Sequence, residues 1–274
     1  MTSTRRIGLA RALSKLGYCS RAQAFALIRA GRVRLNGAIK RDPEAPLDLN
    51  RARIEVDGAP LASAEKIYLA FNKPRGIVTT ASDEKGRATV YSLLPTGLSW
   101  VAPVGRLDKA SEGLLLLTND SEWAARMTAP ESHLEKIYHV QISRGTRLPD
   151  APRRIKSTSR TPAFTNDDDL LRSMQRGVLT EGELLRAKRA ALLRAGEKNC
   201  WLEITLDEGR NRHIRRMMNV LGIEVLRLVR VAIGPLALGD LPKGAVRRLT
   251  SAEKSATDAA LARHSSESEV QRRN

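Results

Sequence analysis

A short stretch of small and polar residues, LASAEK at 61–66, interrupts the chain just before the apolar run IYLAF. Such a stretch is typical of a linker, and 274 residues suit either one large domain or a small domain joined to a larger one. The linker favours the second arrangement. We therefore expect a first domain at 5–60, a larger domain at 67–250, and a short C-terminal helix that frays into a disordered tail at 251–274.

The chain is strongly basic, with 47 Lys and Arg residues against 30 Asp and Glu residues and a net charge of +17. This excess of positive charge favours a polyanion as the partner. Aromatic residues make up only 4% of the chain, so a row of stacking platforms for single strands is not expected. Structured nucleic acid fits the composition better.

The two cysteines, Cys19 and Cys200, are too few and too far apart for a disulfide framework or a zinc site, which favours a reducing compartment. Residues 1–16 contain no continuous apolar run of the kind found in signal peptides, and no apolar run of 18 residues occurs anywhere. We expect a soluble cytoplasmic protein that makes no contact with a membrane and acts as a monomer.

Two short helices and a basic hairpin are expected in the first domain. Apolar residues recur at helical spacing in 7–16, and Ser20 can cap a second helix over 21–30. Asn36 and Gly37 then form a strong two-residue hairpin signal, with Arg32 and Arg34 on the solvent face. The first 60 residues hold 12 basic and 5 acidic residues, a net charge of +7. This order resembles the RNA-binding domain of ribosomal protein S4 and its relatives.

The larger part alternates strand signals and helix signals in an irregular order. Strands are expected at 66–71, 77–80, 114–118, 136–142, 200–206 and 224–233, and helices at 121–127 and 212–221. This order favours an α+β domain built on a mostly antiparallel mixed sheet over a series of βαβ units. The chain has no P-loop, GxGxxG or HExxH motif, and its four histidines form no metal-binding pattern, so no metal and no cofactor are expected.

Polar and charged residues recur near the ends of the expected strands. GRLD at 105–108 precedes a run of four leucines, EKIYHV at 135–140 contains Tyr138, and EGRNRHIRRMM at 208–218 is rich in arginine. Each has a plain structural explanation on its own. Asp108 could cap a turn, Tyr138 could be an ordinary strand residue, and the arginines could bind phosphate without a chemical role.

Five motifs together resemble the bacterial pseudouridine synthases of the Rsu type, which join an S4-like domain to a catalytic domain. They are NKPRG at 72–76, GRLDKASEGLLLLTND at 105–120, EKIYHV, EGRNRHIRRMM and the closing IGPLALGDLPKGAVRRLT at 233–250. Five motifs in the same order are specific, whereas GRLD alone would mean little. Two features depart from the family pattern: Ser121 stands where a glycine commonly follows TND, and the basic segment 144–199 matches poorly.

The resemblance implies an enzyme that isomerises uridine to pseudouridine within ribosomal RNA, with no cofactor or metal. Asp108 matches the catalytic aspartate, Arg215 matches the cation that keeps it ionised, and Tyr138 matches the tyrosine that packs against the base. The uridine must be flipped out of its helix, and Arg106 is the candidate to fill the gap. Candidate RNA-binding residues besides Arg106 are Ser20, Arg21, Arg32, Arg34, Asn36, Arg210 and Arg212.

Two alternatives remain at the sequence level. One is a ribosome-assembly factor that binds RNA on the same fold without turnover, and the presence of Asp108 argues against it. The other is a DNA-binding protein, which gives no reason for the GRLD motif. The sequence indicates neither which uridine is modified nor which ribosomal subunit carries it.

Overall fold

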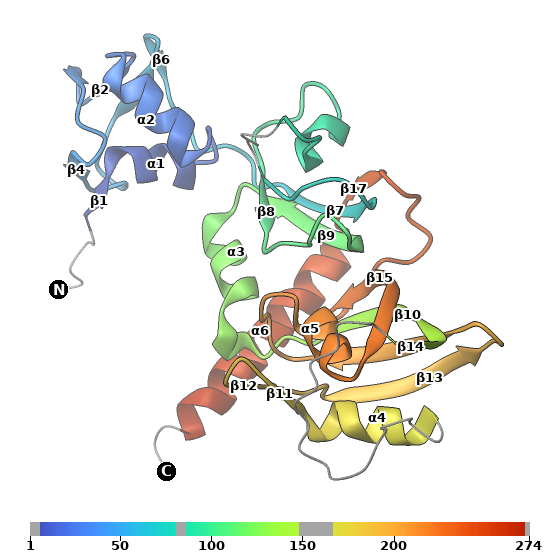
Figure 1. Cartoon of the computed structure of the whole chain (residues 1–274). Coiled ribbons are helices and arrows are strands. Elements are labelled where there is room, and N and C mark those ends of the chain that lie inside the picture. Colours follow the sequence, from blue (N-terminus) through green and yellow to red (C-terminus); the bar gives the residue numbers. More distant parts are fainter. Residues whose placement is uncertain (1–5, 81–85, 148–166, 272–274) are drawn as a thin grey trace.

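A computed structural model describes residues 6–80, 86–147 and 167–271 and shows two packed parts joined by an extended segment (Figure 1). The smaller part has two helices and two small sheets. The helices are α1 (Leu9–Lys15) and α2 (Arg21–Arg29). The four-stranded sheet has the order β3 (Ala38–Lys40), β2 (Val33–Leu35), β5 (Ile54–Val56) and β6 (Ala59–Pro60), and the second sheet pairs β1 (Ile7–Gly8) with β4 (Pro46–Leu47).

Local sequence signals explain the smaller part. The Ser20 side chain accepts a hydrogen bond from the backbone N–H of Gln23, whose own side chain accepts from the Ser20 N–H, so α2 begins with a capping box. Asn36 and Gly37 have φ values of 51° and 82°, which the two-residue turn between β2 and β3 requires. The predicted second helix and hairpin are confirmed. The first helix is shorter than predicted, because Ile7 and Gly8 pair with β4 instead.

The larger part is built on one mixed sheet. Its main path has the order β13 (Arg189–Ala195), β14 (Asn199–Leu206), β10 (Lys136–Arg147), β15 (Ile223–Ile233), β9 (Glu112–Thr118), β7 (Tyr68–Lys73) and β17 (Val246–Arg248). Two short strands lie off this path, β16 (Leu236–Ala237) beside β15 and β8 (Ala102–Val104) beside β9. Among these strand pairs only β15 and β9 run parallel. The predicted mostly antiparallel mixed sheet is confirmed.

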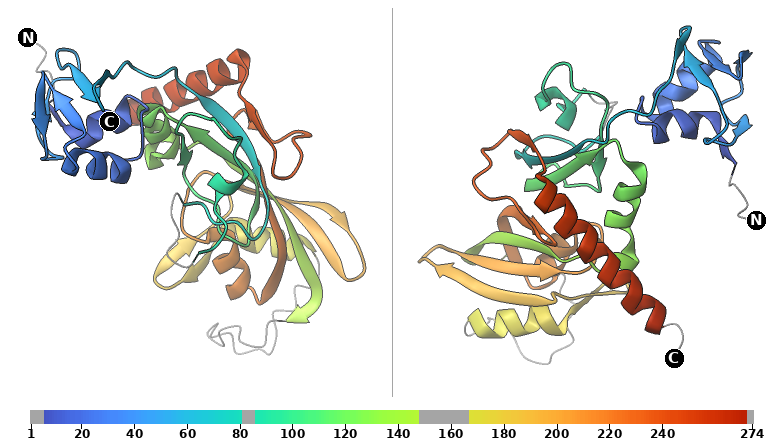
Figure 2. Two further views of the ribbon diagram at one scale, coloured as in Figure 1. Left: turned by 90° about the horizontal axis from the view of Figure 1, so that it is seen from above. Right: turned by 180° about the vertical axis from the view of Figure 1, so that it is seen from behind.

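Helices cover the two faces of this sheet at different ends (Figures 1 and 2). On one face, α4 (Asp167–Arg176) and α5 (His213–Val220) pack against β10, β14 and β15. On the opposite face of β7 and β9, a second core includes α3 (Ser121–Thr128), the 3₁₀ turn η2 (Pro130–Ser132) and α6 (Ser251–Gln271). The 3₁₀ turn η1 (Val90–Leu93) closes the remaining side of β7 and β9.

One expected strand of the larger part is absent, and the C-terminal helix is longer than expected. Residues 77–80 form no strand and contribute only one bridge, Val78 to Thr89. Within the poorly matched segment 144–199, the described residues form the end of β10, then α4, the hairpin of β11 (Val178–Thr180) and β12 (Glu183–Leu185), and β13. The C-terminal helix α6 has 21 residues and buries Thr257, Ala260 and Leu261, whereas the end of the expected disordered tail, 272–274, lies outside the described residues. Within the described residues, no helix is long and apolar enough to cross a membrane.

Candidate functional site

A four-residue turn before β9 presents Asp108, and a buried lysine holds both ends of this turn. The N–H of Ser111 donates to the carbonyl of Asp108 at 3.0 Å, which closes the turn. Lys73, the last residue of β7, is fully buried, and its Nζ donates to the carbonyls of Asp108 at 3.1 Å, Ser111 at 2.8 Å and Pro74 at 3.2 Å. The three N–H groups of the ammonium thus have three carbonyl acceptors.

The two middle carbonyls of the turn are held as well. The N–H of Gly76 donates to the carbonyl of Lys109 at 2.7 Å, and Nη2 of Arg215 donates to the carbonyl of Ala110 at 3.0 Å. All four carbonyls of the turn therefore have a donor. The half-buried carboxylate of Asp108 has no hydrogen bond or ion pair with another described residue. The backbone is fixed and the carboxylate is available to a ligand.

Burial changes the acid–base behaviour of the lysine beneath the turn. The pKa of Lys73 is lowered to about 8, chiefly because burial disfavours the charged form, while the negative charges of Asp108 and Glu112 oppose this shift and Arg230 adds to it. An ammonium that loses its proton keeps only two N–H donors for three carbonyls. The number of hydrogen bonds that Lys73 donates to the turn should therefore fall as the pH rises above about 8.

Arg215 lies beside the turn and contacts its backbone. The position of α5 directs the guanidinium to the carbonyl of Ala110 and to the carbonyl of Val225 at 3.4 Å, and the role of Arg215 as the cation that keeps Asp108 ionised stays a prediction. Burial, followed by the charge of Arg212, lowers the pKa of Arg215, and the charge of Asp108 opposes this shift. Arg215 thus acts on Asp108 through the turn and through a longer-range charge interaction.

Tyr138 lies on the face of β10 that packs against the core containing α5. Its backbone neighbours are Ile204 on β14 and Arg230 on β15, and Arg230 is in turn the neighbour of Gly113 on β9. Gly113 pairs with Lys73 on β7. Directly paired residues share a face of a sheet, so Tyr138 and Lys73 stand at two ends of one row across four strands. The row connects the tyrosine to the lysine under the Asp108 turn.

Two residues of this region were not singled out from the sequence. Glu112 is buried, with 3% of its surface exposed, and its carboxylate accepts hydrogen bonds from Arg227 and from Lys243 at 2.7 Å. Gly113 has a φ of +100°, and a Cβ there would lie 2.3 Å from the carbonyl oxygen of Arg230. In the sequence, the only signals were an acidic residue at the start of an apolar strand and a glycine next to it. Their roles become clear only from the strand pairing, which places Gly113 against Arg230.

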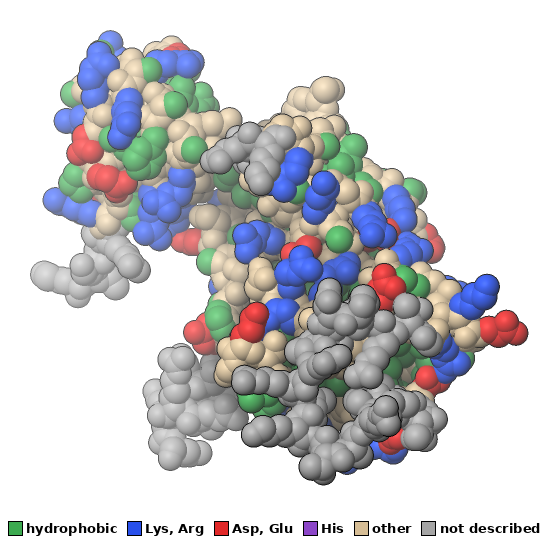
Figure 3. Space-filling view, viewed as in Figure 1, with side chains coloured by type: hydrophobic (Ala, Val, Ile, Leu, Met, Phe, Trp, Pro, Cys, Tyr) green, Lys and Arg blue, Asp and Glu red, His purple; other side chains and the backbone are tan. Residues whose placement is uncertain are grey.

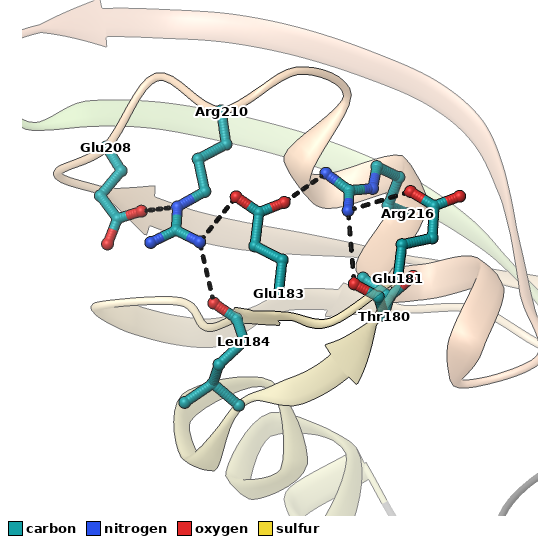
Figure 4. Close-up of polar contacts among 7 residues, drawn as sticks. All are labelled: Thr180, Glu181, Glu183, Leu184, Glu208, Arg210 and Arg216. Atoms are coloured by element: carbon teal, nitrogen blue, oxygen red, sulfur yellow. Dashed lines mark hydrogen bonds and ion pairs between the residues drawn. The ribbon is translucent and has the colours of Figure 1, made fainter.

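The arginines of the segment 208–218 divide into paired and unpaired groups (Figure 4). Arg210 pairs with Glu208 and with Glu183 at 2.8 Å, and the other carboxylate oxygen of Glu183 accepts from Arg216 at 2.7 Å. Arg210 is thus paired with two carboxylates of its own chain, and its RNA-binding role stays a prediction. Arg212 is exposed, and its side chain has no hydrogen bond or ion pair with another described residue, although its carbonyl accepts from the N–H of Arg216 at 2.8 Å.

Arg106 is also exposed and makes no hydrogen bond or ion pair within the described residues. On the face of the molecule that Figure 3 shows, Lys and Arg side chains gather over the middle of the larger part and over the smaller part. The structure thus leaves Arg106 and Arg212 free to meet an anion. No group of three metal-ligating side chains occurs in the described ranges.

The candidate residues of the smaller part mostly have partners in their own chain. Arg32 pairs with Asp57 at 2.5 Å, and Nη1 of Arg34 donates to the carbonyl of Gly37 at 3.2 Å. The side-chain oxygen of Asn36 accepts from the N–H of Arg53 at 2.9 Å, and Ser20 forms the cap of α2. By contrast Arg21 is exposed, and its side chain has no hydrogen bond or ion pair with another described residue. These contacts explain the local fold, and RNA binding by these side chains stays a prediction.

Two family models match the chain. One, described as RNA pseudouridylate synthase, matches residues 67–220, which is more than half of the chain, and the other, the S4 domain, matches residues 7–51. An RNA pseudouridine synthase of Rickettsia conorii, described as uncharacterized, is 34% identical over 244 residues, which cover 89% of this chain and 96% of that protein. Ribosomal large subunit pseudouridine synthase B of Bacillus subtilis is 32% identical over 247 residues, covering 89% of this chain and 93% of that protein.

A solved structure has the same overall arrangement. It is described as a crystal structure of a pseudouridylate synthase, and it superimposes with a TM-score of 0.58 and 28% sequence identity. The similarity covers 91% of this chain and 99% of that one. It therefore includes both packed parts and not the larger part alone.

Proposed function

Because the chain belongs to the RNA pseudouridylate synthase family, we propose that it converts uridine to pseudouridine in ribosomal RNA. Family membership confirms the predicted reaction class, and no finding favours a non-catalytic assembly factor. The Bacillus subtilis relative is named for the large ribosomal subunit, so the RNA of that subunit is the first substrate to test. The predicted S4-like domain is likewise confirmed by the family model.

One observation supports the assignment of the catalytic group above all others. The carboxylate of Asp108 has no partner among the described residues, while every carbonyl of its turn has a donor. A turn-capping aspartate would use its carboxylate oxygens to accept backbone N–H groups, as Asp120 does at the start of α3. The carboxylate of Asp108 accepts no such hydrogen bond, so it does not stabilise the turn. Instead, the turn holds the carboxylate in place.

The isomerisation breaks the bond between ribose C1′ and uracil N1 and rejoins the ribose to C5 of the same base. Asp108 assists this departure, either by attacking C1′ or by another contact with the ribose, and Tyr138 packs against the detached base. Arg215 orients the turn. Flipping the uridine out of its helix costs roughly a few kcal/mol, and Arg106 fills the gap that the base leaves.

Contacts to RNA phosphates offset the cost of flipping. We assign these phosphate contacts to the smaller part and to Arg212 at the start of α5. In the smaller part, Arg21 is the first candidate, because its exposed side chain has no partner among the described residues. Arg32, Arg34, Asn36 and Ser20 contribute less than Arg21, because each has a partner in its own chain, and the same holds for the paired Arg210.

The reaction consumes nothing and its product is an isomer of its substrate, so the proposed enzyme needs RNA and no cofactor. We also propose that it acts as a monomer in the cytoplasm, where ribosomal RNA is made and matured. The domain limits that we use for this function are 5–60 for RNA binding and 67–250 for catalysis, with 61–66 between them.

Transcribed ribosomal RNA of each subunit tests the proposal. The purified protein is incubated with each RNA, and pseudouridine is mapped chemically, with the RNA of the other subunit as the control. We expect modification at one or a few uridines of one RNA. If neither RNA, naked or in partly assembled particles, gains any pseudouridine, the chain is not an RNA-modifying enzyme of this kind.

A further inference from the structure

Arg230 on β15 is a buried cation without a carboxylate partner. Only 6% of its surface is exposed, and Nε donates to the carbonyl of Leu114 at 2.8 Å. Its Nη2 is buried without a hydrogen-bond partner among the described residues. Burial of a charge without an opposite charge costs folding free energy, so an unpaired guanidinium at this depth calls for a functional explanation.

The sheet places Arg230 between the two groups that the proposed reaction uses. Its direct neighbours are Tyr138 on β10 and Gly113 on β9, five residues after Asp108. Gly113 has no side chain, and its backbone approaches the Arg230 backbone so closely that a Cβ would lie 2.3 Å from the carbonyl oxygen. Arg230 therefore belongs to the row of paired residues between Tyr138 and Lys73, the lysine that holds the Asp108 turn.

Two other cations, the buried Lys73 and the half-buried Lys136, interact electrostatically with Arg230. Its charge lowers the pKa of Lys73 and that of Lys136, where burial is the larger cause and the resulting pKa is about 8 in both cases. Asp108, Glu112 and Asp207 are the carboxylates whose charges oppose these shifts. Glu112 is already paired with Arg227 and Lys243, so positive charge prevails in this row of the sheet.

We propose that Arg230 stabilises the negative charge that uracil carries when it is detached from the ribose. When the C1′–N1 bond breaks, its electron pair stays on the uracil, spread over N1, O2 and O4, while an oxygen of Asp108 bonds to C1′. After rotation, C5 bonds to C1′, the carboxylate is released, and the proton from C5 ends on N1. A fixed positive charge under the base lowers the energy of this anion without being consumed.

This inference rests on the proposed function, and its test separates the two. Arg230→Met removes the charge, and Arg230→Gln also keeps an amide that can donate to Leu114. Arg194→Met is the matched control, because this arginine lies in an exposed position on β13 of the same sheet. The substrate is the ribosomal RNA fragment that the enzyme modifies, made with either uridine or 5-fluorouridine, whose base carries negative charge more readily because fluorine withdraws electrons.

Loss of the N1 glycosidic bond is followed in a single turnover by digesting the RNA to nucleosides, which are separated by chromatography and identified by mass spectrometry. We expect Arg230→Met to slow the uridine reaction about a hundredfold, to leave RNA affinity within about twofold, and to slow the 5-fluorouridine reaction much less. Arg230→Lys, which keeps the charge, should remain within about tenfold of the unsubstituted enzyme. Arg194→Met should behave like the unsubstituted enzyme with both bases.

Equal slowing with both bases would show that Arg230 only supports the fold, and an unchanged rate would also overturn the inference. If melting shows that Arg230→Met is unfolded, Arg230→Gln and Arg230→Lys decide in the same assay, because they differ in charge and both retain a donor. An Asp108→Asn variant run alongside distinguishes the two claims. If it turns over normally, the proposed function fails, whereas an inactive Asp108→Asn with a fully active Arg230→Met overturns only the role of Arg230.

Discussion

At the scale of single residues, the site depends on a turn whose backbone has little freedom left. A reacting group must lie within about 3–3.5 Å of its target in the correct direction, and a misplacement of about 1 Å can cost a hundredfold in rate. Lys73 supplies two of the hydrogen bonds that hold the turn, and Gly76 and Arg215 supply two more. Small changes at Lys73 should therefore change the chemistry more than RNA binding.

The rate and the stability should respond to pH in opposite directions. Because the pKa of Lys73 is about 8, deprotonation above that pH removes one donor from the turn, so kcat should fall. Unfolding returns the pKa towards its ordinary value of 10.5, so between about pH 8 and 10.5 the unfolded chain binds more protons and the free energy of unfolding should rise with pH. The measurements are kcat and urea unfolding across this range.

Lys136 provides the control for this profile, since its pKa is also lowered to about 8. The fall in kcat should persist in Lys136→Met and disappear in Lys73→Met, whose rate should be low and flat at every pH. A fall that persists unchanged in Lys73→Met would mean that another group titrates and that the lysine does not hold the turn.

At the scale of elements, strands with strong apolar patterns were predictable, and elements defined by tertiary contacts were not. β9, β14 and β15 agree closely with their predicted ranges, because their buried positions alternate or run continuously. Residues 77–80 have β-branched side chains but no neighbouring strand to pair with beyond one bridge. The hairpin of β11 and β12 was missed because Glu183 is held by distant arginines, which no local pattern reveals.

Gly113 is the position where one added methyl group should disturb the sheet most. Gly113→Ala would place Cβ 2.3 Å from the Arg230 carbonyl oxygen at a φ of +100°, so we expect a loss of at least about 3 kcal/mol in the free energy of unfolding. Gly244→Ala is the control, because it also has a positive φ but nothing lies within 4 Å, and it should lose only about 1–2 kcal/mol.

Urea unfolding monitored by tryptophan fluorescence suits this comparison, because Trp100, Trp123 and Trp201 all lie in the larger part. A loss at Gly113 no greater than that at Gly244 would show that β9 and β15 can separate without cost. The row from Tyr138 to Lys73 would then not be the rigid support that the site requires.

At the scale of the whole molecule, the linker is fixed to the larger part and contacts the smaller one. The side-chain oxygen of Asn119 accepts from the N–H of Ile67 at 2.8 Å, and its amide donates to the carbonyl of Glu65 at 2.8 Å. The N–H of Ala64 donates to the carbonyl of Leu16, and Lys15 pairs with Glu122 at 2.6 Å. These contacts fix the position of the smaller part relative to the larger one, so RNA bound by the smaller part should reach the Asp108 turn from one defined direction.

Removal of residues 1–61 should weaken RNA binding without abolishing the chemistry. The loss of a part with a net charge of about +7 removes phosphate contacts, so affinity should fall and its dependence on salt should become shallower. The checks are binding titrations at several salt concentrations and the rate at saturating RNA. Equal affinity with an equal salt slope would show that the smaller part does not hold the substrate.

The two-part organisation of the molecule was predictable from the sequence, because five motifs in order indicated the family, and with it both packed parts. The path of α6 did not, because few large apolar residues occur in 251–274 and the helix is held by small side chains such as Thr257 and Ala260. The contact between Arg215 and the backbone of the Asp108 turn did not follow from the sequence either. Sequence spacing brings α5 to the turn but does not determine which atom the guanidinium meets.

The central claim is that Asp108 performs the chemistry while other groups bind the RNA, and Asp108→Asn tests it most directly. The substitution keeps the size of the side chain and removes its charge, and Asp240→Asn, at an exposed site, is the matched control. Pseudouridine formed in ribosomal RNA is counted beside a binding titration with the same RNA. We expect no turnover by Asp108→Asn, with affinity changed by less than about tenfold, or roughly 1.4 kcal/mol. Turnover near the unsubstituted rate would contradict the claim and return Asp108 to the role of a turn residue.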